Sequence, residues 1–356
     1  MTEQSAPPAR PAAVAAADTE PPRPARRYDV PRLALGVIRI GPALMLVGIV
    51  AVMWSLSDVF MTTGNFGNVL SQTAVIAVLA IAQLLVLLTR GIDLSVGSTL
   101  ALAAVVGALV FASVKSGPLV IVAMLATGLA VGAVNGTVYV WGRLPHPFII
   151  TLATLSVARG LALWLSGGQP HRGMPPVIQT IGGDHVGDPI AWLPYSSFLV
   201  LGLVLLVYVL LTRMVWGRWI YAVGGNPEGA RRAAIPVNGV LISVYVFSGL
   251  CAGIAAFITA GRLNAGSPTF GELAELDSIA AVVIGGASFM GGRGNIGNAI
   301  LGALMIGVIR NGMNLLDVDA FLQPIVIGIV IVIAVELDVV RGWLERRLRV
   351  LQAARS

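Results

Sequence analysis

The sequence predicts an all-α, polytopic membrane protein of about ten transmembrane helices, and three observations lead to that prediction. Hydrophobic residues make up 56% of the chain and charged residues only 11%, whereas a soluble domain carries about 25% charged residues. Apolar runs long enough to cross a bilayer recur along the chain. Basic residues are concentrated in alternate segments between those runs, as expected when positive charges set membrane orientation.

Ten apolar runs define the expected transmembrane domain, which we place at residues 31–342. The runs lie at about 35–55, 69–89, 96–114, 118–141, 147–166, 196–214, 238–260, 276–290, 297–315 and 322–340. Most of them reach the roughly 20 residues that span a hydrocarbon core, although the eighth is short and glycine-rich. The segment 1–30 is rich in Ala, Pro and Arg, which predicts a disordered cytoplasmic tail. We expect the segment 343–356 to form a basic cytoplasmic tail.

The distribution of basic residues gives the expected orientation. With ten spans and the N-terminus in the cytoplasm, 17 of the 23 Lys and Arg residues fall in inside segments. Three fall outside, and three fall within runs, among them Arg159 and Arg310. An odd number of spans would place the Arg-rich C-terminal segment outside, against the positive-inside rule. Both termini are therefore expected in the cytoplasm.

A weak internal similarity links the fourth and ninth runs. The fourth contains Gly-Leu-Ala-Val-Gly-Ala-Val-Asn-Gly at 128–136, and the ninth contains Ile-Gly-Val-Ile-Arg-Asn-Gly at 306–312. These runs lie five spans apart and so cross the membrane in opposite directions. An inverted repeat of five plus five helices would produce this pattern, although small residues look alike in many membrane helices.

Lysine and cysteine usage limits the chemistry that the chain can carry. The only lysine, Lys115, is not preceded by the glycine-rich run of a phosphate-binding loop. The chain therefore does not bind ATP through such a loop, and any ATP-driven function needs a partner. The net charge of +6 reflects membrane topology rather than nucleic-acid binding. The single cysteine, Cys251, lies in an apolar run and is expected to be a buried packing residue. We expect no catalytic site and no metal site.

Two polar segments border the third and fifth runs. In 89–98, Asp93 and Ser95 are placed to cap the following helix, and Asp93 is a candidate gate residue at the cytoplasmic mouth. A capped turn with no transport role explains the same residues. In 147–154, Phe148, Thr151 and Thr154 are candidate pathway residues, because the two threonines share a helix face. Their hydroxyls could equally bond back to their own helix.

The segment 217–235 carries the strongest helix-start signal outside the apolar runs. Asn226 and Pro227 can act as cap and first residue, and Glu228 then falls in the first turn. A short helix at about 225–236, lying along the membrane surface, would suit docking of a partner. The candidate docking residues are Asn226, Pro227, Glu228, Gly229, Ala230, Arg231 and Arg232.

The eighth run is interrupted by glycines, and such a broken span is a sequence indication of a transport site. Asp277 and Ser278 stand at its start, where we expect them to cap it from outside and to border the translocation pathway. Glycines that permit close helix contact would explain the same interruption.

Four segments together resemble the permease subunits of the ribose, xylose and arabinose ABC importers. They are Gly-Ile-Asp-Leu-Ser-Val-Gly at 91–97, Pro-Phe-Ile-Ile-Thr-Leu at 147–152, Tyr-Ala-Val-Gly-Gly-Asn-Pro-Glu at 221–228 and Leu-Asp-Ser-Ile-Ala-Ala-Val-Val-Ile-Gly-Gly at 276–286. The resemblance covers about residues 35–340, and four motifs in the same order make a chance match very improbable. The chain departs from it at Gly229, where the family commonly has Ala, and locally at His146.

The resemblance implies a bacterial inner-membrane subunit that pairs with a second permease subunit, identical or closely related. It also implies two ATPase subunits that bind ATP and Mg²⁺, and an extracytoplasmic sugar-binding protein. The region of Glu228 resembles the coupling helix that fits into a groove of the ATPase. No cofactor is expected in this chain.

Two other functions share the same architecture. An ABC permease for branched-chain amino acids or nucleosides is the nearer alternative, and the Asp93-Leu94-Ser95 sequence favours a sugar permease over it. An ion-coupled secondary transporter normally carries ionisable groups in mid-span. Asp93, Asp277 and Glu336 instead fall near the ends of runs.

Overall fold

The computed structural model describes residues 30–187, 190–333 and 336, with side chains described from residue 41 onward. The tails expected at 1–30 and 343–356 lie outside these residues, except for Val30. Within the described residues the chain is helical apart from connectors and two strands of two residues each. The all-α prediction is confirmed.

Among the described residues, seven helices are long and apolar enough to cross a membrane. They are α2 (Thr63–Leu88), α3 (Val96–Val114), α4 (Gly117–Trp141), α5 (Phe148–Ser166), α7 (Tyr195–Arg213), α10 (Val237–Leu263) and α12 (Ile296–Leu315). α1 (Val30–Leu56) contains the apolar stretch Gly41–Leu56, and Gln323–Ile333 forms another shorter apolar helix. Each of these helices coincides with one of the apolar runs in the sequence. The prediction of a polytopic membrane protein is therefore confirmed.

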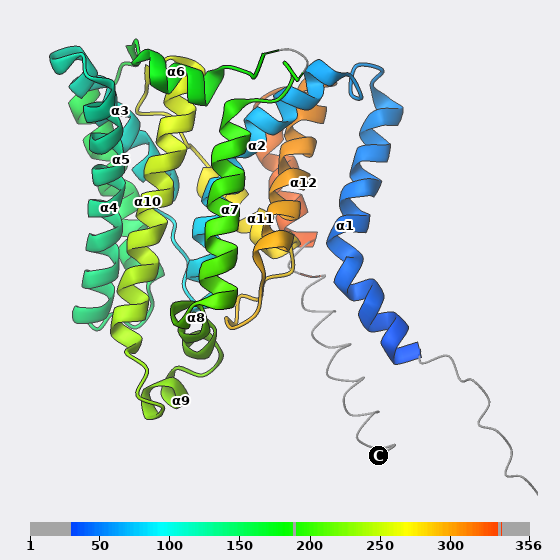
Figure 1. Ribbon diagram of the computed structural model, residues 1–356, viewed down its shortest axis with the longest axis vertical. Helices are drawn as coiled ribbons and strands as arrows, with labels where there is room; N and C mark the ends of the chain where they lie inside the picture. Colours follow the sequence, from blue (N-terminus) through cyan, green and yellow to red (C-terminus); the bar gives the residue numbers. More distant parts are fainter. Residues whose placement is uncertain (1–29, 188–189, 334–335, 337–356) are drawn as a thin grey trace, which may run out of the picture.

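The helices surround a centre formed by α2 and α10 (Figure 1). Of the apolar window of α2, 83% is buried, whereas the windows of α4, α5 and α7 are only 17–22% buried. α3, α4 and α5 stand on one side of this centre, and α11, α12 and α1 stand on the other. Large apolar side chains such as Trp164 remain exposed on the outer helices, as expected for surfaces that face lipid.

Glycines bring the backbones of α4 and α10 into direct contact. A Cβ atom on Gly128 would lie 2.2 Å from the carbonyl oxygen of Gly249, and one on Gly249 would lie 2.1 Å from that of Gly128. Gly132 packs against the same stretch of α10. Close approach of this kind, made possible by small residues, is a main source of helix association within lipid.

The packing of α12 repeats that of α4 in the opposite direction. α4 packs against α10 and α3, and α12 packs in the same way against α2 and α11. Both helices use a glycine at the corresponding contact: Gly128 meets α10, and a Cβ on Gly307 would lie 1.9 Å from the Thr73 hydroxyl oxygen of α2. This correspondence supports the inverted repeat that the sequence indicated.

α11 (Ala274–Ile284) is too short to cross the membrane as a helix. Its 11 residues extend about 16 Å, roughly half of a hydrocarbon core. The interruption that the glycines of the run 276–290 predicted is present: the helix ends at Ile284, and the backbone turns at Gly286, where φ is 85°. The N–H groups of Gly286 and Ala287 bond to the carbonyls of Val283 and Val282 at 2.7 and 3.1 Å, which closes the helix end. The chain then continues without helix to the start of α12.

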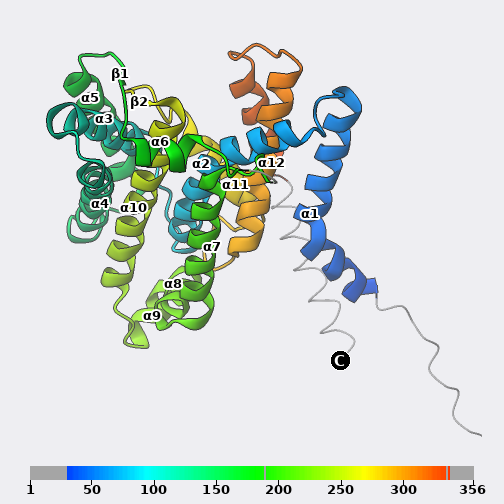
Figure 2. The same cartoon turned by 45° about the horizontal axis from the view of Figure 1, so that its top comes forward.

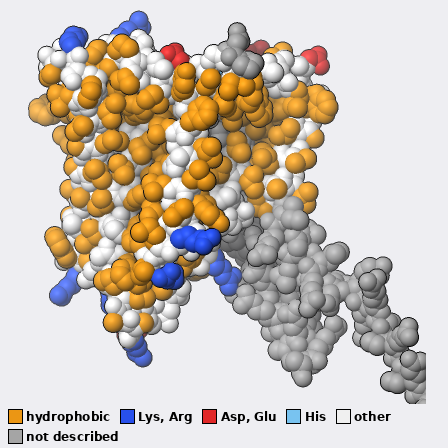
Figure 3. Space-filling view, in the orientation of Figure 1, with side chains coloured by type: hydrophobic (Ala, Val, Ile, Leu, Met, Phe, Trp, Pro, Cys, Tyr) orange, Lys and Arg blue, Asp and Glu red, His pale blue; other side chains and the backbone are white. Residues whose placement is uncertain are grey.

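The two ends of the bundle differ in structure. At one end, called the α6 side, α6 (Pro176–Gly183) packs on α10, and β1 (His171–Arg172) pairs antiparallel with β2 (Ala265–Gly266) (Figure 2). The described parts of the long connection between α5 and α7, residues 167–187 and 190–194, therefore lie at this end. At the other end, called the α9 side, lie α8 (Val215–Gly225) and α9 (Pro227–Arg232). Figure 3 shows basic side chains at both ends of this face and acidic ones only at the α6 side.

Candidate functional site

α9 begins with the capping arrangement that the sequence predicted. The side-chain oxygen of Asn226 accepts a hydrogen bond from the N–H of Gly229 at 2.9 Å, and Pro227 is the first helical residue. Glu228 lies in the first turn and Arg231 and Arg232 in the last, so the charges complement the helix dipole. The prediction of a short, well-defined helix at this place is confirmed.

The helix is shorter than the expected 225–236 because its C-terminal end is closed early. Ala234 adopts a left-handed conformation with φ of 58°. The N–H of Ala234 bonds to the Arg231 carbonyl and that of Ile235 to the Ala230 carbonyl, both at 3.0 Å. This bonding pattern usually has glycine at the left-handed position. With alanine there, the sequence offers no clear sign of the helix end.

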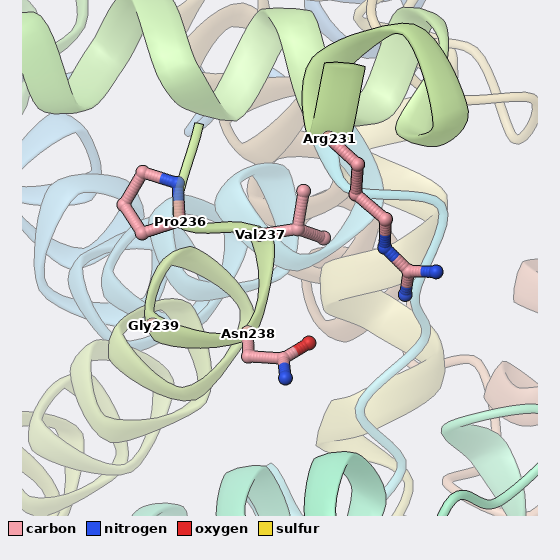
Figure 4. A pocket seen from close by; sticks show the side chains of 5 residues that line it. All are labelled: Arg231, Pro236, Val237, Asn238 and Gly239. Carbon is pink, nitrogen blue, oxygen red and sulfur yellow. The ribbon is translucent and has the colours of Figure 1, made fainter. Parts of the chain in front are cut away.

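The exposed surface of α9 has two different arginines. Arg232 forms an ion pair with Glu228 four residues earlier, with an N···O distance of 3.5 Å. Arg231 instead borders a cavity of about 240 Å³ together with Pro236, Val237, Asn238 and Gly239. Figure 4 shows the Arg231 guanidinium and the Asn238 amide extending into the same space from α9 and the start of α10. Ala230 is buried, so it anchors α9 while the charged residues stay accessible.

Three segments that are distant in the sequence meet directly above α9, and we call this contact the α8 junction. It consists of the end of α2 (88–90), the end of α8 (224–225) and the segment after α11 (291–294). Arg90 donates hydrogen bonds from Nε to the Gly224 carbonyl and from Nη2 to the Gly225 carbonyl, each 2.6 Å. The N–H of Gly292 donates to the Leu88 carbonyl at 2.9 Å.

Tyr221 gives the α8 junction a further bond. Its hydroxyl donates to the Gly294 carbonyl at 2.8 Å. Burial raises the pKa of the Tyr221 phenol, so the hydroxyl keeps the proton that it donates at neutral pH. The segment after α11 therefore bonds to Tyr221 within α8 and also lies against the end of α8 at Gly224.

A second polar group, the Asp93 cluster, lies deeper in the bundle. Asp93 is 1% exposed, and its carboxylate accepts bonds from the Ser95 hydroxyl and from the Ser248 hydroxyl, each at 2.7 Å. The Asn135 amide donates to the Ser95 hydroxyl at 2.8 Å, and Thr154 donates to the Asn135 oxygen at 2.6 Å. With its amide nitrogen toward the Asp93 carbonyl, Gln83 also bonds to the backbone of Asp93. The cluster thus consists of Gln83, Asp93, Ser95, Asn135, Thr154 and Ser248.

The cluster explains how the connector before α3 is held. The Asp93 carboxylate accepts a hydrogen bond from the N–H of Ser95 at 3.0 Å. Ser95 is the residue directly before α3, and the Ser95 side chain makes no capping bond to the helix. The expectation that Asp93 or Ser95 caps α3 is therefore wrong, because neither side chain bonds to an N–H group of the helix itself. Thr151 donates to the Ile92 carbonyl and to the Phe148 carbonyl, each at 3.2 Å, so the threonine face of α5 also contacts this connector. Phe148 itself is 42% exposed and lies apart from the cluster.

Asp277 and Ser278 do not cap α11. The residue before the helix is Leu273, with no side-chain capping bond, because α11 begins at Ala274 and both polar residues fall inside it. Asp277 instead forms a buried ion pair with Arg310 of α12, with an N···O distance of 2.6 Å. The Ser278 hydroxyl donates to the Glu275 carbonyl at 2.8 Å. The expectation that Asp277 and Ser278 cap α11 is therefore wrong. Asp277 instead links α11 to α12 through its ion pair with Arg310.

Two further polar contacts join separate elements of the bundle. Asn311, next to Arg310, exchanges amide hydrogen bonds of 2.8 and 3.0 Å with Asn65 of α2. Arg159 of α5 donates to the carbonyls of Pro268 and Phe270 in the segment between β2 and α11. Arg159, Asp277 and Arg310 thus have partners from other helices or connectors.

The structure brings some candidate residues together and separates others. Asp93, Ser95 and Thr154 belong to one cluster and Thr151 borders it, whereas Asp277 and Ser278 lie on α11 and Phe148 faces outward. The candidates predicted from the sequence did not include three further members of the Asp93 cluster, Gln83, Asn135 and Ser248. Each is a polar residue inside an apolar run, and Asn135 lies in the glycine pattern noted in the fourth run. Whether these residues line a pathway stays a prediction.

In the described part of the chain, no group of three or more His, Cys, Asp or Glu residues could hold a metal ion. The Asp93 cluster joins residues of several helices deep in the bundle, and α9 carries exposed charged residues at one end. A bundle of apolar helices with an ordered helix exposed at one end is the form of a membrane permease subunit.

Comparison with known proteins identifies the family. The family model described as "Branched-chain amino acid transport system / permease component" matches residues 65–335. The ribose import permease protein RbsC of Escherichia coli (strain K12) is 39% identical over 297 residues, which cover 83% of this chain and 92% of that protein. The D-allose transport system permease protein AlsC of the same strain is 38% identical over 303 residues, covering 84% and 91%. The fructose import permease protein FrcC of Rhizobium meliloti is 36% identical over 285 residues, covering 78% of each chain.

The chain belongs to this family of ABC importer permease subunits. No solved structure matches it.

Proposed function

We propose that this chain forms the membrane path of an ATP-driven importer for a monosaccharide of the ribose, allose or fructose type. The relatives that cover most of the chain are import permeases named for these sugars. Sugars reach such a permease from an extracytoplasmic binding protein, and ATP with Mg²⁺ is bound by two partner subunits. A second permease subunit, identical or closely related, completes the path.

The observation that carries the proposal is α9. It is an ordered helix with charged residues exposed at the α9 side of the bundle. The connectors and helix ends of this side hold more basic residues than those of the α6 side, namely Arg90, Arg143, Arg213, Arg218, Arg231, Arg232 and Arg293 against Lys115, Arg172 and Arg262. By the positive-inside rule the α9 side is cytoplasmic, which also places both termini in the cytoplasm. ATPase subunits act from that side, so α9 is available as the coupling helix.

Transport follows an alternating-access scheme. Closure of the ATPase subunits on ATP pushes α9, and the movement reaches the spans that carry Thr151, Thr154 and Asp277. Asp93 and Ser95 stand in the connector on the same side as α9 and belong to the gate, while Phe148 and Ser278 border the path. Because Gly229 lies within α9, where a helical glycine costs up to about 1 kcal/mol relative to Ala, the helix is less rigid than with alanine.

The test of this proposal changes the exposed surface of α9. The full transporter, with its ATPase and binding protein, is reconstituted with Glu228→Ala and Arg231→Ala combined. We expect insertion in the membrane and ATP hydrolysis to persist while sugar uptake falls at least tenfold. A variant with Arg213→Ala and Arg218→Ala, two exposed arginines on the same side, is the control. Normal uptake by the α9 variant would exclude α9 as the coupling element.

The description of the family model favours a second substrate class. It names branched-chain amino acids, and the same fold could carry them. Uptake of labelled leucine in the same vesicles, compared with uptake of D-ribose, D-allose and D-fructose, decides between the two classes.

A further inference from the structure

The α8 junction joins the three cytoplasmic segments that a coupling movement would have to connect. α8 leads directly into α9 through Asn226. The end of α2 leads into the connector that carries Asp93. The segment 291–294 follows the break after α11. Hydrogen bonds join the end of α8 to the end of α2 through Arg90, and the end of α2 to the segment 291–294 through the Leu88 carbonyl.

Arg90 holds the junction with an unusual geometry. Its backbone φ is 68°, in the left-handed region that is unfavourable for residues other than glycine. That conformation directs the guanidinium to two successive carbonyls at the end of α8. The end of a helix presents unpaired carbonyl groups with partial negative charge, and a cation bonded there is favoured. Because the guanidinium is planar and rigid, the two bonds fix how far the end of α8 lies from the end of α2 and how the two ends are oriented relative to each other.

Glycines make the contact direct. A Cβ on Gly224 would lie 1.7 Å from the Leu88 carbonyl oxygen and 2.7 Å from the Gly292 nitrogen. A Cβ on Gly225, the next residue, would meet nothing within 4 Å. The backbone of α8 therefore touches those of α2 and of the segment after α11 at Gly224, with no side chain between them that could absorb a displacement.

We propose that the α8 junction transmits the displacement of α9 to α11 and to the Asp93 connector, and that Arg90 is its positioning residue. This inference rests on the proposed function, because it assigns a route for the movement that the ATPase subunits generate. Arg90 is exposed at the end of α2 and its guanidinium bonds to the end of α8, so it acts by keeping these two helix ends moving as one body.

The first test compares two arginines near the same helix. The complete transporter is purified with wild-type permease, with Arg90→Ala, with Arg90→Lys and with Arg218→Ala. ATP hydrolysis and uptake of D-ribose, D-allose or D-fructose, whichever the wild type accumulates, are measured in the same vesicles. For Arg90→Ala we expect the ATPase to copurify within twofold of wild type and the sugar transported per ATP to fall at least tenfold. Arg90→Lys keeps the charge without the two-pronged bond and should lie between. Arg218, exposed on α8, should change the ratio less than twofold.

The second test separates Gly224 from Gly225. Gly224→Ala adds a methyl group that forces the end of α8 away from the backbone of Leu88 and Gly292. The Arg90 side chain is not altered in this variant. Gly225→Ala adds the same methyl group one residue later, where space is open. We expect the transport-to-hydrolysis ratio to fall at least tenfold for the first and less than twofold for the second. This pair keeps the inference testable if Arg90→Ala fails to fold.

The outcomes distinguish the inference from the proposed function. If the wild-type complex neither binds an ATPase nor accumulates a sugar, the proposed function and this inference both fail. If the wild type couples uptake to ATP and Arg90→Ala or Gly224→Ala keeps the ratio within twofold, the inference alone is wrong. Equal loss in Gly224→Ala and Gly225→Ala would also contradict it, because the junction contact is specific to Gly224.

Discussion

The Asp93 cluster and α9 both contain charged and polar residues, but they stand in opposite surroundings. In the cluster, Asp93 is 1% exposed and its partners come from α10 and the start of α3. On α9, the side chains of Arg232 and Glu228 are 80% and 65% exposed, and they bond within one helix. Buried polar groups must be paired or the fold loses stability, whereas exposed pairs contribute little. The cluster therefore belongs to the architecture of the bundle, and α9 is a surface for a partner.

The largest effect is expected at the buried ion pair between Asp277 and Arg310. Asp277→Ala leaves the Arg310 charge without its partner between α11 and α12. Loss of one member of a fully buried pair costs roughly 3–5 kcal/mol, and because the Arg310 side chain is 30% exposed we expect a loss near the lower end of that range. The free energy of unfolding in mixed detergent micelles measures this. Combining Asp277→Leu with Arg310→Met should recover most of the loss. A decrease below about 1 kcal/mol for the single variant would show that the pair is solvated, against its burial here.

The next effect is expected at Asp93. Asp93→Ala leaves the hydroxyl groups of Ser95 and Ser248 without their acceptor, which should lower the free energy of unfolding by about 2–3 kcal/mol. Asp93→Asn keeps an oxygen acceptor and should lose less. The same detergent titration compares the two variants. Equal stability of Asp93→Ala and the wild type would show that the hydrogen bonds of the Asp93 carboxylate do not stabilise the bundle.

A smaller and local effect is expected at Asn226. Asn226→Ala removes the capping bond to Gly229 and should weaken α9 by about 1 kcal/mol. Asp at this position retains a capping oxygen, so Asn226→Asp is the matched control. Hydrogen exchange of the α9 amides should be faster for the Ala variant and unchanged for the Asp variant. Faster exchange throughout α2 and α10 would mean that α9 is part of the stabilising core.

The smallest effect on stability is expected at the exposed pair on α9. Glu228→Ala should lower the free energy of unfolding by less than about 0.5 kcal/mol, because an exposed pair four residues apart is screened by water. The contrast with Asp277→Ala measures the difference between the two surroundings. A loss of several kcal/mol would show that α9 contacts the rest of the protein more closely than its exposure indicates.

Much of the fold follows from the sequence, because apolar run length and basic-residue asymmetry depend on local composition. The ends of α3, α4 and α12 coincide with their runs within one residue. The start of α9 was also predictable, since Asn226 and Pro227 act within one turn. The glycines of the eighth run indicated an interruption, but they did not predict the residue at which α11 ends, because the run continues in apolar residues past the turn at Gly286.

The partners of the candidate residues could not be predicted in the same way. Asp93 bonds to Ser248, which is 155 residues away, and Asp277 bonds to Arg310 on the next helix. Such pairs depend on how whole helices pack, and that packing depends on glycine contacts such as Gly128 with Gly249. A polar residue within an apolar run indicates that a partner exists, but it does not identify the partner.

We propose that this chain forms the path of the sugar across the membrane and that a partner subunit supplies the energy from ATP. The most direct test is uptake into vesicles that contain the permease with or without its ATPase, with binding protein and sugar on one side and ATP on the other. We predict accumulation only when ATPase and ATP are both present, and none when a proton or sodium gradient is imposed on the permease alone. Gradient-driven accumulation without the ATPase would contradict the account and identify an ion-coupled transporter.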